Sequence, residues 1–164
     1  MGCMEERSYN QVVEACADRL YGFAYRLTRD ADAAADLVQD AFLKLWEYEA
    51  EVKEPAAFLY AVLYRAFADA VRRGRLKRRY AADAGLSEPP GQGDRAVERM
   101  EWCDYMAEAL AGLSDVQRAV LLLRDYEGYN YAEIGEMTGL SESQVKVYLF
   151  RARVKLKTIL RNRM

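Results

Sequence analysis

The sequence predicts an all-α fold of two small helical domains joined by a flexible linker, and three observations support this prediction. Apolar residues recur at spacings of three and four along nearly the whole chain, as they do in amphipathic helices. No segment of useful length alternates apolar and polar residues as a strand would. Residues 81–94 hold two of the three prolines and three of the ten glycines. With 164 residues, 52% of them hydrophobic, the chain can form a packed core in one domain or in two small ones.

The first predicted domain, residues 1–80, contains three helices. The first runs from about Tyr9 to Leu27 on its apolar spacing. Asp30 is a suitable N-cap for the second helix, because its carboxylate can accept hydrogen bonds from the free N–H groups of the first turn. Residues 47–54 interrupt the pattern, and Pro55 fits the first turn of a third helix.

The same spacing predicts which residues of the second and third helices face the core. The apolar stripe of the second helix is Ala34, Leu37, Val38, Ala41, Phe42, Leu45 and Trp46. The inner face of the third helix is Phe58, Leu59, Val62, Ala66, Ala70 and Val71. The third helix then runs into a basic block, RRGRLKRR.

The linker and the second domain follow. Residues 81–94 are too poor in bulky apolar residues to pack, so we place the linker there. The second domain, residues 95–164, begins with a helix from about Arg95 to Ala111. Ser114 is the expected N-cap of the next helix, which ends at Gly128.

Two capping boxes in close succession predict a helix-turn-helix. Asn130 with Glu133 can begin a short helix, and Ser141 with Gln144 can begin a longer one. Between them Gly139 suits the positive φ of a tight turn. On the short helix we expect Ala132, Ile134 and Met137 to face Leu140, Val145 and Leu149. The inward residues of the longer helix are Val145, Leu149, Ala152, Leu156 and Ile159.

The remaining faces of this last helix are polar and basic. Such a helix can enter the major groove of DNA by its N-terminal half. Gln144 and Lys146 are suitable to contact base edges, and Arg151 and Arg153 lie where phosphates would lie. The candidate DNA-binding residues are Ser143, Gln144, Lys146, Val147, Phe150, Arg151, Arg153 and Lys155.

Charge is unevenly distributed along the chain, although its net value is only −2. Residues 61–80 and residues 141–164 each carry seven basic residues and one acidic residue, whereas the rest of the chain is acidic. This segregation indicates separate surfaces with separate partners.

Several function classes are disfavoured. The chain has no histidine, which removes histidine-based catalysis and histidine metal ligands, and it carries no phosphate-binding or dinucleotide motif. The spacing of its three cysteines fits no metal motif, so free thiols are expected. We therefore expect no enzyme activity, no metal and no cofactor. We also expect no membrane insertion and a cytoplasmic location, because no apolar run or signal segment is present.

The sequence resembles a known family. The stretch LSDVQRAVLLLRDYEGYNYAEIGEMTGLSESQVKVYLFRARVKLK is similar to region 4 of sigma-70 factors of the small extracytoplasmic-function (ECF) group. The stretch YGFAYRLTRDADAAADLVQDAFLKLWE resembles the start of region 2, and FLYAVLYRAFADAVRR resembles its promoter-melting part. The resemblance covers roughly Tyr9–Arg79 and Val97–Leu160.

The resemblance implies a sigma factor that directs promoter-specific transcription initiation, with region 2 in residues 1–80 and region 4 in residues 95–164. The candidate DNA-binding residues of the last helix would recognise the minus-thirty-five element. The expected minus-ten residues are Tyr60, Tyr64, Arg65, Arg72 and Arg73, with tyrosines for base stacking and arginines for phosphates. The expected polymerase-binding residues are Asp36, Leu37, Gln39, Asp40 and Phe42.

The implied partners are core RNA polymerase, through its clamp helices and flap, promoter DNA, and an anti-sigma protein; the chain is expected to be a monomer. The alternative is a stand-alone helix-turn-helix regulator whose N-terminal half dimerises or senses a signal. Gel filtration with core polymerase separates the two, since only a sigma factor is expected to co-elute with it.

Overall fold

The structure is a computed structural model that describes residues 4–48, 50–74 and 105–163. Within these ranges it contains helices and no strand, so the predicted all-α fold is confirmed. The chain forms two compact units, an N-terminal and a C-terminal one. The predicted linker, residues 81–94, lies outside the described residues, as do residues 75–80 of the basic block.

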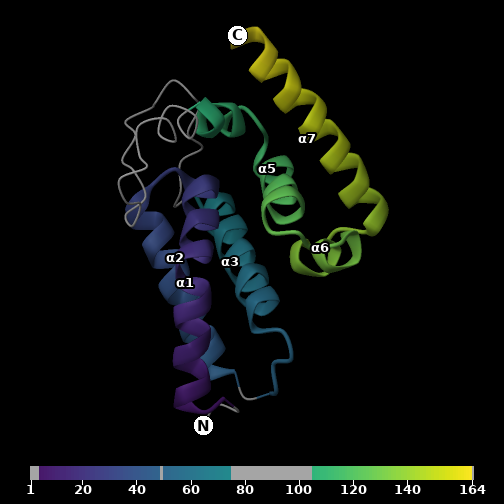
Figure 1. Cartoon of the computed structure of the whole chain (residues 1–164). Helices are drawn as coiled ribbons and strands as arrows, with labels where there is room; N and C mark the ends of the chain where they lie inside the picture. Colours follow the sequence, from purple (N-terminus) through teal and green to yellow (C-terminus); the bar gives the residue numbers. More distant parts are fainter. Residues whose placement is uncertain (1–3, 49, 75–104, 164) are drawn as a thin grey trace. The chain divides into compact units, whose positions relative to one another are not determined.

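The N-terminal unit consists of α1 (Glu6–Thr28), α2 (Ala31–Glu47) and α3 (Pro55–Arg72), each packed against the other two (Figure 1). α1 stops at Arg29, which adopts a left-handed conformation with φ 55°. The Asp30 carboxylate accepts hydrogen bonds from the backbone N–H groups of Asp32 at 3.0 Å and Ala33 at 3.1 Å. Asp30 is therefore the N-cap of α2, as predicted, and the chain reverses direction within two residues.

The predicted inner face of α3 is wrong, apart from Leu59. The buried residues are Leu59, Tyr60, Leu63, Tyr64 and Phe67, whereas the other five predicted residues are only half-buried. Both sets have helical spacing, and the set with the larger aromatic rings faces the core because these rings bury more apolar area.

The apolar stripe of α2 also differs from the prediction at one end. Leu37 and Leu45 are buried as expected, but Trp46 is 41% exposed. Its ring lies edge-on against the ring of Tyr9, with the centroids 4.9 Å apart. Trp46 therefore covers the side of α1 rather than entering the core.

The described part of the C-terminal unit contains a helical segment at residues 105–111, followed by α5 (Asp115–Leu121), the π-helix η2 (Leu122–Tyr126), α6 (Tyr131–Thr138) and α7 (Glu142–Arg163) (Figure 1). Residues 95–104 of the predicted first helix of this domain lie outside the described residues. Ser114 caps α5 through a complete capping box with Gln117, so this N-cap prediction is confirmed. The helical run ends before Gly128, as predicted, but its last turn is a π-helix that the sequence spacing did not indicate.

The core of the C-terminal unit joins α5 to α7. Leu121, Leu123, Ile134 and Leu149 are almost completely buried. Ala132, predicted to face this core, is exposed, because the inner side of the short helix α6 is wide enough only for Ile134, Gly135 and Met137.

Candidate nucleic-acid interface

The helix-turn-helix is held by side-chain caps at the start of each of its helices. The Asn130 side chain accepts a hydrogen bond from the Glu133 N–H at 2.8 Å, but its amide donates to the Glu133 carboxylate at 2.8 Å, so the first box is only half formed. The second box is complete: the Gln144 N–H donates to Ser141 Oγ at 3.1 Å, and the Ser141 N–H donates to Gln144 Oε1 at 2.9 Å. The Gln144 amide oxygen thus caps α7, so only its amide nitrogen is available for the predicted base contact.

Two glycines shape the turn between α6 and α7. Gly139 has φ 78°, in the region that favours glycine, and its N–H donates to the Gly135 carbonyl at 2.8 Å. A Cβ atom at Gly135 would lie 2.7 Å from the Leu140 carbonyl oxygen, which is closer than real contacts allow. The predicted role of Gly139 is confirmed, whereas the requirement at Gly135 was missed, because it depends on the close approach of the turn to α6.

α7 has one face buried and the other exposed. Val145, Leu149 and Ala152 are buried, and Leu156 and Ile159 are half-buried, in agreement with the predicted inner face. All eight candidate DNA-binding residues are exposed: Ser143, Gln144, Lys146, Val147, Phe150, Arg151, Arg153 and Lys155. They thus lie on one continuous surface of α7 that is accessible to a partner molecule.

Two cations lie beside the ring of Tyr131 at the start of α6. The Lys146 Nζ is 5.7 Å from the ring centroid, and the Arg124 guanidinium carbon is 5.2 Å from it. Arg124 also donates a hydrogen bond to the Tyr129 carbonyl at 3.0 Å. A cation over an aromatic face is attracted by the negative face of the ring. Tyr131 therefore gathers positive charge beside the N-terminal half of α7.

Arg153 is held by an ion pair within its own unit. Its Nη2 lies 2.6 Å from Asp125 Oδ1, and its Nε donates to Asp125 Oδ2 at 3.2 Å. This two-point contact with Asp125 raises the pKa of Arg153 above its ordinary value. Arg151, the other cation predicted to reach a phosphate, is exposed on α7, as is Lys155.

The candidate polymerase-binding residues of α2 separate into two groups. Asp36, Gln39 and Asp40 are exposed, whereas Leu37 and Phe42 are 6% and 8% exposed and belong to the core. The two buried side chains pack α2 onto the core, and only the three polar side chains are accessible to a partner.

Sequence reasoning missed two apolar residues on that surface. Leu43 and Trp46 are 52% and 41% exposed. Together with Asp36 and Gln39 they follow the spacing i, i+3, i+7 and i+10, which places all four on one side of α2. The same spacing is visible in the sequence, but the predicted inner face of α2 includes Trp46. We call Asp36, Gln39, Asp40, Leu43 and Trp46 the α2 surface.

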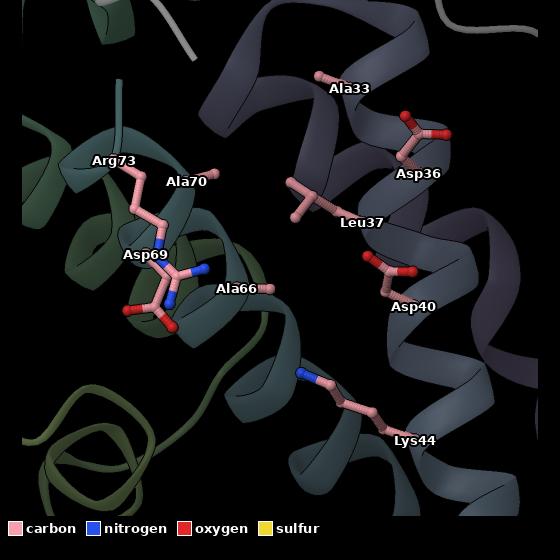
Figure 2. A pocket seen from close by; sticks show the side chains of 9 residues that line it. All are labelled: Ala33, Asp36, Leu37, Asp40, Lys44, Ala66, Asp69, Ala70 and Arg73. Carbon is pink, nitrogen blue, oxygen red and sulfur yellow. The ribbon is translucent and has the colours of Figure 1, made fainter. Parts of the chain in front are cut away.

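A pocket of about 390 Å³ lies beside this surface, between α2 and the C-terminal half of α3 (Figure 2). Its lining residues are Ala33, Asp36, Leu37, Asp40, Lys44, Ala66, Asp69, Ala70 and Arg73. The small alanine side chains leave the space open, and Figure 2 shows Leu37 and Lys44 extending from α2 toward α3. The pocket therefore has an apolar floor and a rim that carries charges of both signs.

The candidate minus-ten residues are also divided by burial. Tyr60 and Tyr64 are 3% and 8% exposed, and the Tyr60 ring packs edge-on against Phe23, with the centroids 5.1 Å apart. In this conformation the two tyrosine rings are part of the core and present no stacking face to DNA. Arg65, Arg72 and Arg73 are exposed, and Arg72 pairs with Asp69.

In the described part of the chain, no group of histidine, cysteine, aspartate and glutamate residues could hold a metal ion. None of the helices in this part combines the length and apolar character that crossing a membrane requires. Burial raises the pKa of the Cys16 thiol, which is half-buried, while Cys3 and Cys103 lie outside the described residues.

Comparisons with known proteins match each half of the chain to a region of one protein family. Residues 12–77 match the family model for Sigma-70 region 2, and residues 103–156 match that for Sigma-70 region 4. The chain is 30% identical to the ECF RNA polymerase sigma factor SigL of Mycobacterium tuberculosis, over 81% of this chain and 77% of that protein. It is also 30% identical to the probable RNA polymerase sigma factor RfaY of Xanthomonas campestris, over 99% of this chain but only 42% of RfaY.

A solved structure agrees with these matches. The sigma factor RpoE of Bartonella quintana, crystallised with the anti-sigma factor NepR, superposes with a TM-score of 0.76 at 25% identity. The similarity covers 94% of this chain and 98% of RpoE.

Proposed function

The chain belongs to the sigma-70 family, in its ECF group, and from this premise we propose that it binds core RNA polymerase and directs promoter-specific transcription initiation. The observation that carries the proposal is that both family regions occur in order in one chain, region 2 on the three-helix unit and region 4 on the helix-turn-helix. The chain itself has no catalytic role in this proposal, and RNA synthesis remains with the polymerase. The domain division at residues 1–80, 81–94 and 95–164 is part of the proposal.

The helix-turn-helix recognises the minus-thirty-five element by inserting the N-terminal half of α7 into the major groove. Ser143, Gln144 and Lys146 lie near base edges, and Arg151 and Lys155 contact phosphates. The support for these roles is their exposure on one side of α7 and the positive charge gathered at Tyr131.

The α2 surface docks on the clamp helices of core polymerase. Its carboxylates suit a basic partner, and its exposed Leu43 and Trp46 supply apolar area that the docking removes from water. The flap of the polymerase is the proposed contact of the C-terminal unit.

The minus-ten element is contacted by arginines of α3 and of its C-terminal end. Arg65, Arg72 and Arg73 are exposed and basic, which suits phosphate contacts. Tyr60 and Tyr64 act beneath them by packing α3 onto the core.

We further propose that the chain works in the cytoplasm as a monomer outside the polymerase and is held inactive by an anti-sigma protein. The support for such an inhibitor is that RpoE, its structural neighbour, was crystallised with the anti-sigma factor NepR.

The test is run-off transcription with purified core polymerase on a library of promoter fragments, together with gel filtration. We expect co-elution with core polymerase and transcripts that depend on the added chain. A protein that elutes apart from the polymerase as a dimer and binds duplex DNA alone would instead be a stand-alone regulator.

A further inference from the structure

An apolar stripe runs along the outer face of α7. Val147, Phe150 and Val154 step by three and four and are 45%, 70% and 50% exposed. They lie on the side of the helix opposite the buried Leu149 and Ala152. Exposed apolar side chains that line up along one helix face indicate a surface that meets something else.

The surroundings of the stripe specify what that partner is. Lys146 flanks it on one side and Arg151 on the other, and both are exposed. Ser143 continues the same line toward the N-terminus of α7. Over residues 141–164 the chain has seven basic residues and one acidic residue. A row of apolar groups between two rows of cations fits a polyanion that itself presents apolar groups.

DNA has such groups in its major groove. The 5-methyl group of thymine is the apolar feature of a base pair there, and apolar side chains contact it directly. A helix rises about 1.5 Å per residue, so Val147 and Phe150 lie about 4.5 Å apart along α7. This separation exceeds the rise of about 3.4 Å between successive base pairs by only about 1 Å, a difference that the two side chains can span. Val154 lies a further turn away from the N-terminal half that enters the groove.

We propose that Val147 and Phe150 read the 5-methyl groups of thymines at two neighbouring base pairs of the minus-thirty-five element. The inference rests on the proposed function, because it assumes that α7 enters the groove of promoter DNA. It adds that part of the preference for a promoter sequence comes from apolar contacts with thymine methyl groups, whereas Lys146 supplies polar contacts. The two side chains exclude water from the methyl groups, so a base without the methyl loses this contact and keeps all its hydrogen bonds.

Replacement of thymine by deoxyuridine tests this idea, since it removes only the 5-methyl group. The minus-thirty-five element is first selected from a randomised duplex library with holoenzyme assembled from the full chain and core polymerase. Each thymine of the selected element is then replaced singly by deoxyuridine, on either strand, and holoenzyme binding is measured. We expect an affinity loss of about fourfold at each of two neighbouring base pairs and none elsewhere.

Three variants assign the two methyl groups to side chains. Val147→Ala should abolish the deoxyuridine penalty at one base pair, and Phe150→Ala should abolish it at the other. Val154→Ala is the matched control, since it removes the same kind of exposed side chain one turn further on and should keep both penalties. All three side chains are exposed, and unchanged melting temperatures verify that the variants fold.

The outcomes separate this inference from the proposed function. Selection of an element that binds equally well with thymine and deoxyuridine overturns the inference and leaves the sigma-factor proposal intact. Penalties that persist in both Val147→Ala and Phe150→Ala also overturn it, as does a selected element without neighbouring thymines. Holoenzyme that selects no element at all contradicts the proposed function itself.

Discussion

In each of the two units one helix, α2 or α7, has a buried face and an exposed outer face, and the charges of these outer faces differ. On α2 the outer face carries Asp36 and Asp40 beside the exposed Leu43. On α7 it carries Lys146 and Arg151 beside exposed apolar residues. Both surfaces combine charged residues with exposed apolar residues, so the exposure of side chains alone does not distinguish their partners. The sign of the charge distinguishes them, because the acidic surface of α2 suits a basic protein and the basic surface of α7 suits DNA.

The largest effect is expected from a substitution that deforms one unit and spares the other. Gly135→Ala places a Cβ atom 2.7 Å from the Leu140 backbone oxygen, so the turn of the helix-turn-helix must shift. We expect a destabilisation of about 1–3 kcal/mol in the C-terminal unit and a loss of promoter-specific transcription of at least about a hundredfold. Thermal unfolding and run-off transcription measure the two effects.

The matched control is Gly22→Ala in α1. A Cβ atom there would meet only the end of the flexible Arg26 side chain, at 3.0 Å. Because alanine favours a helix interior over glycine by roughly 0.8–1 kcal/mol, this variant should be neutral or more stable and remain fully active. Gly135→Ala should still co-elute with core polymerase, since its α2 surface is intact. Normal transcription by Gly135→Ala would show that the turn tolerates displacement.

Charge reversal on α2 tests the other unit. Asp40→Lys brings a positive charge against a partner proposed to be basic, and like-charge juxtaposition costs several kcal/mol. We expect binding to core polymerase to fall by about ten- to a hundredfold, with no change in melting temperature, because Asp40 is exposed. Gel filtration and a titration of core polymerase measure this loss.

Asp18→Lys is the matched control, because Asp18 is exposed on α1 and its reversal changes the net charge equally. Undiminished co-elution of Asp40→Lys would remove the docking role of the α2 surface. An equal loss in both variants would assign the effect to the overall charge of the unit.

Lys146→Ala and Arg151→Ala separate the two kinds of DNA contact proposed for α7, those with bases and those with phosphates. Lys146→Ala should cost about 1–3 kcal/mol on the preferred promoter and little on unrelated DNA. Arg151→Ala should weaken binding to both kinds of DNA alike and reduce the salt dependence of the affinity by about one ion. Affinities at several salt concentrations measure both effects. A uniform loss for Lys146→Ala would mean that this lysine contacts only phosphate.

Local signals in the sequence predicted the parts of the fold that depend on neighbouring residues. The caps at Asp30, Ser114 and Ser141 and the positive φ of Gly139 each rest on a few adjacent residues, and all are present in the structure. The inner face of α3 could not be predicted from spacing, because Tyr60 belongs to a competing stripe of the same period.

For the candidate site, the exposure of the candidate DNA-binding residues of α7 followed from its period, but not all of their side-chain partners did. Gln144 was predicted both to complete the capping box of α7 and to contact base edges, and the structure confirms the capping box. Trp46 was assigned to the core, because apolar character alone does not say which side of α2 has room for a large ring. The pairing of Arg153 joins residues 28 positions apart in the sequence, beyond the reach of any local pattern.

The smallest expected effect concerns that pair. Asp125 lies in the π-helix η2, whose i→i+5 hydrogen bonds change the direction of the side chains that follow, and its carboxylate holds the Arg153 guanidinium at two points. Both side chains are partly exposed, so Asp125→Ala should cost only about 0.2–1 kcal/mol of stability. Because the pairing raises the pKa of Arg153, it stabilises the protein below the ordinary pKa of arginine, and this cost should not change between pH 6 and pH 9.

The same substitution releases the Arg153 side chain toward solvent. Because a released guanidinium can bind a phosphate, Asp125→Ala should strengthen DNA binding by holoenzyme a few-fold at low salt and steepen its salt dependence by about one ion. Arg153→Ala should lose the same stability as Asp125→Ala without the gain in affinity. Unfolding curves and salt titrations of both variants measure this difference. If Asp125→Ala weakens DNA binding instead, the ion pair positions α7 for the groove rather than withholding a cation from it.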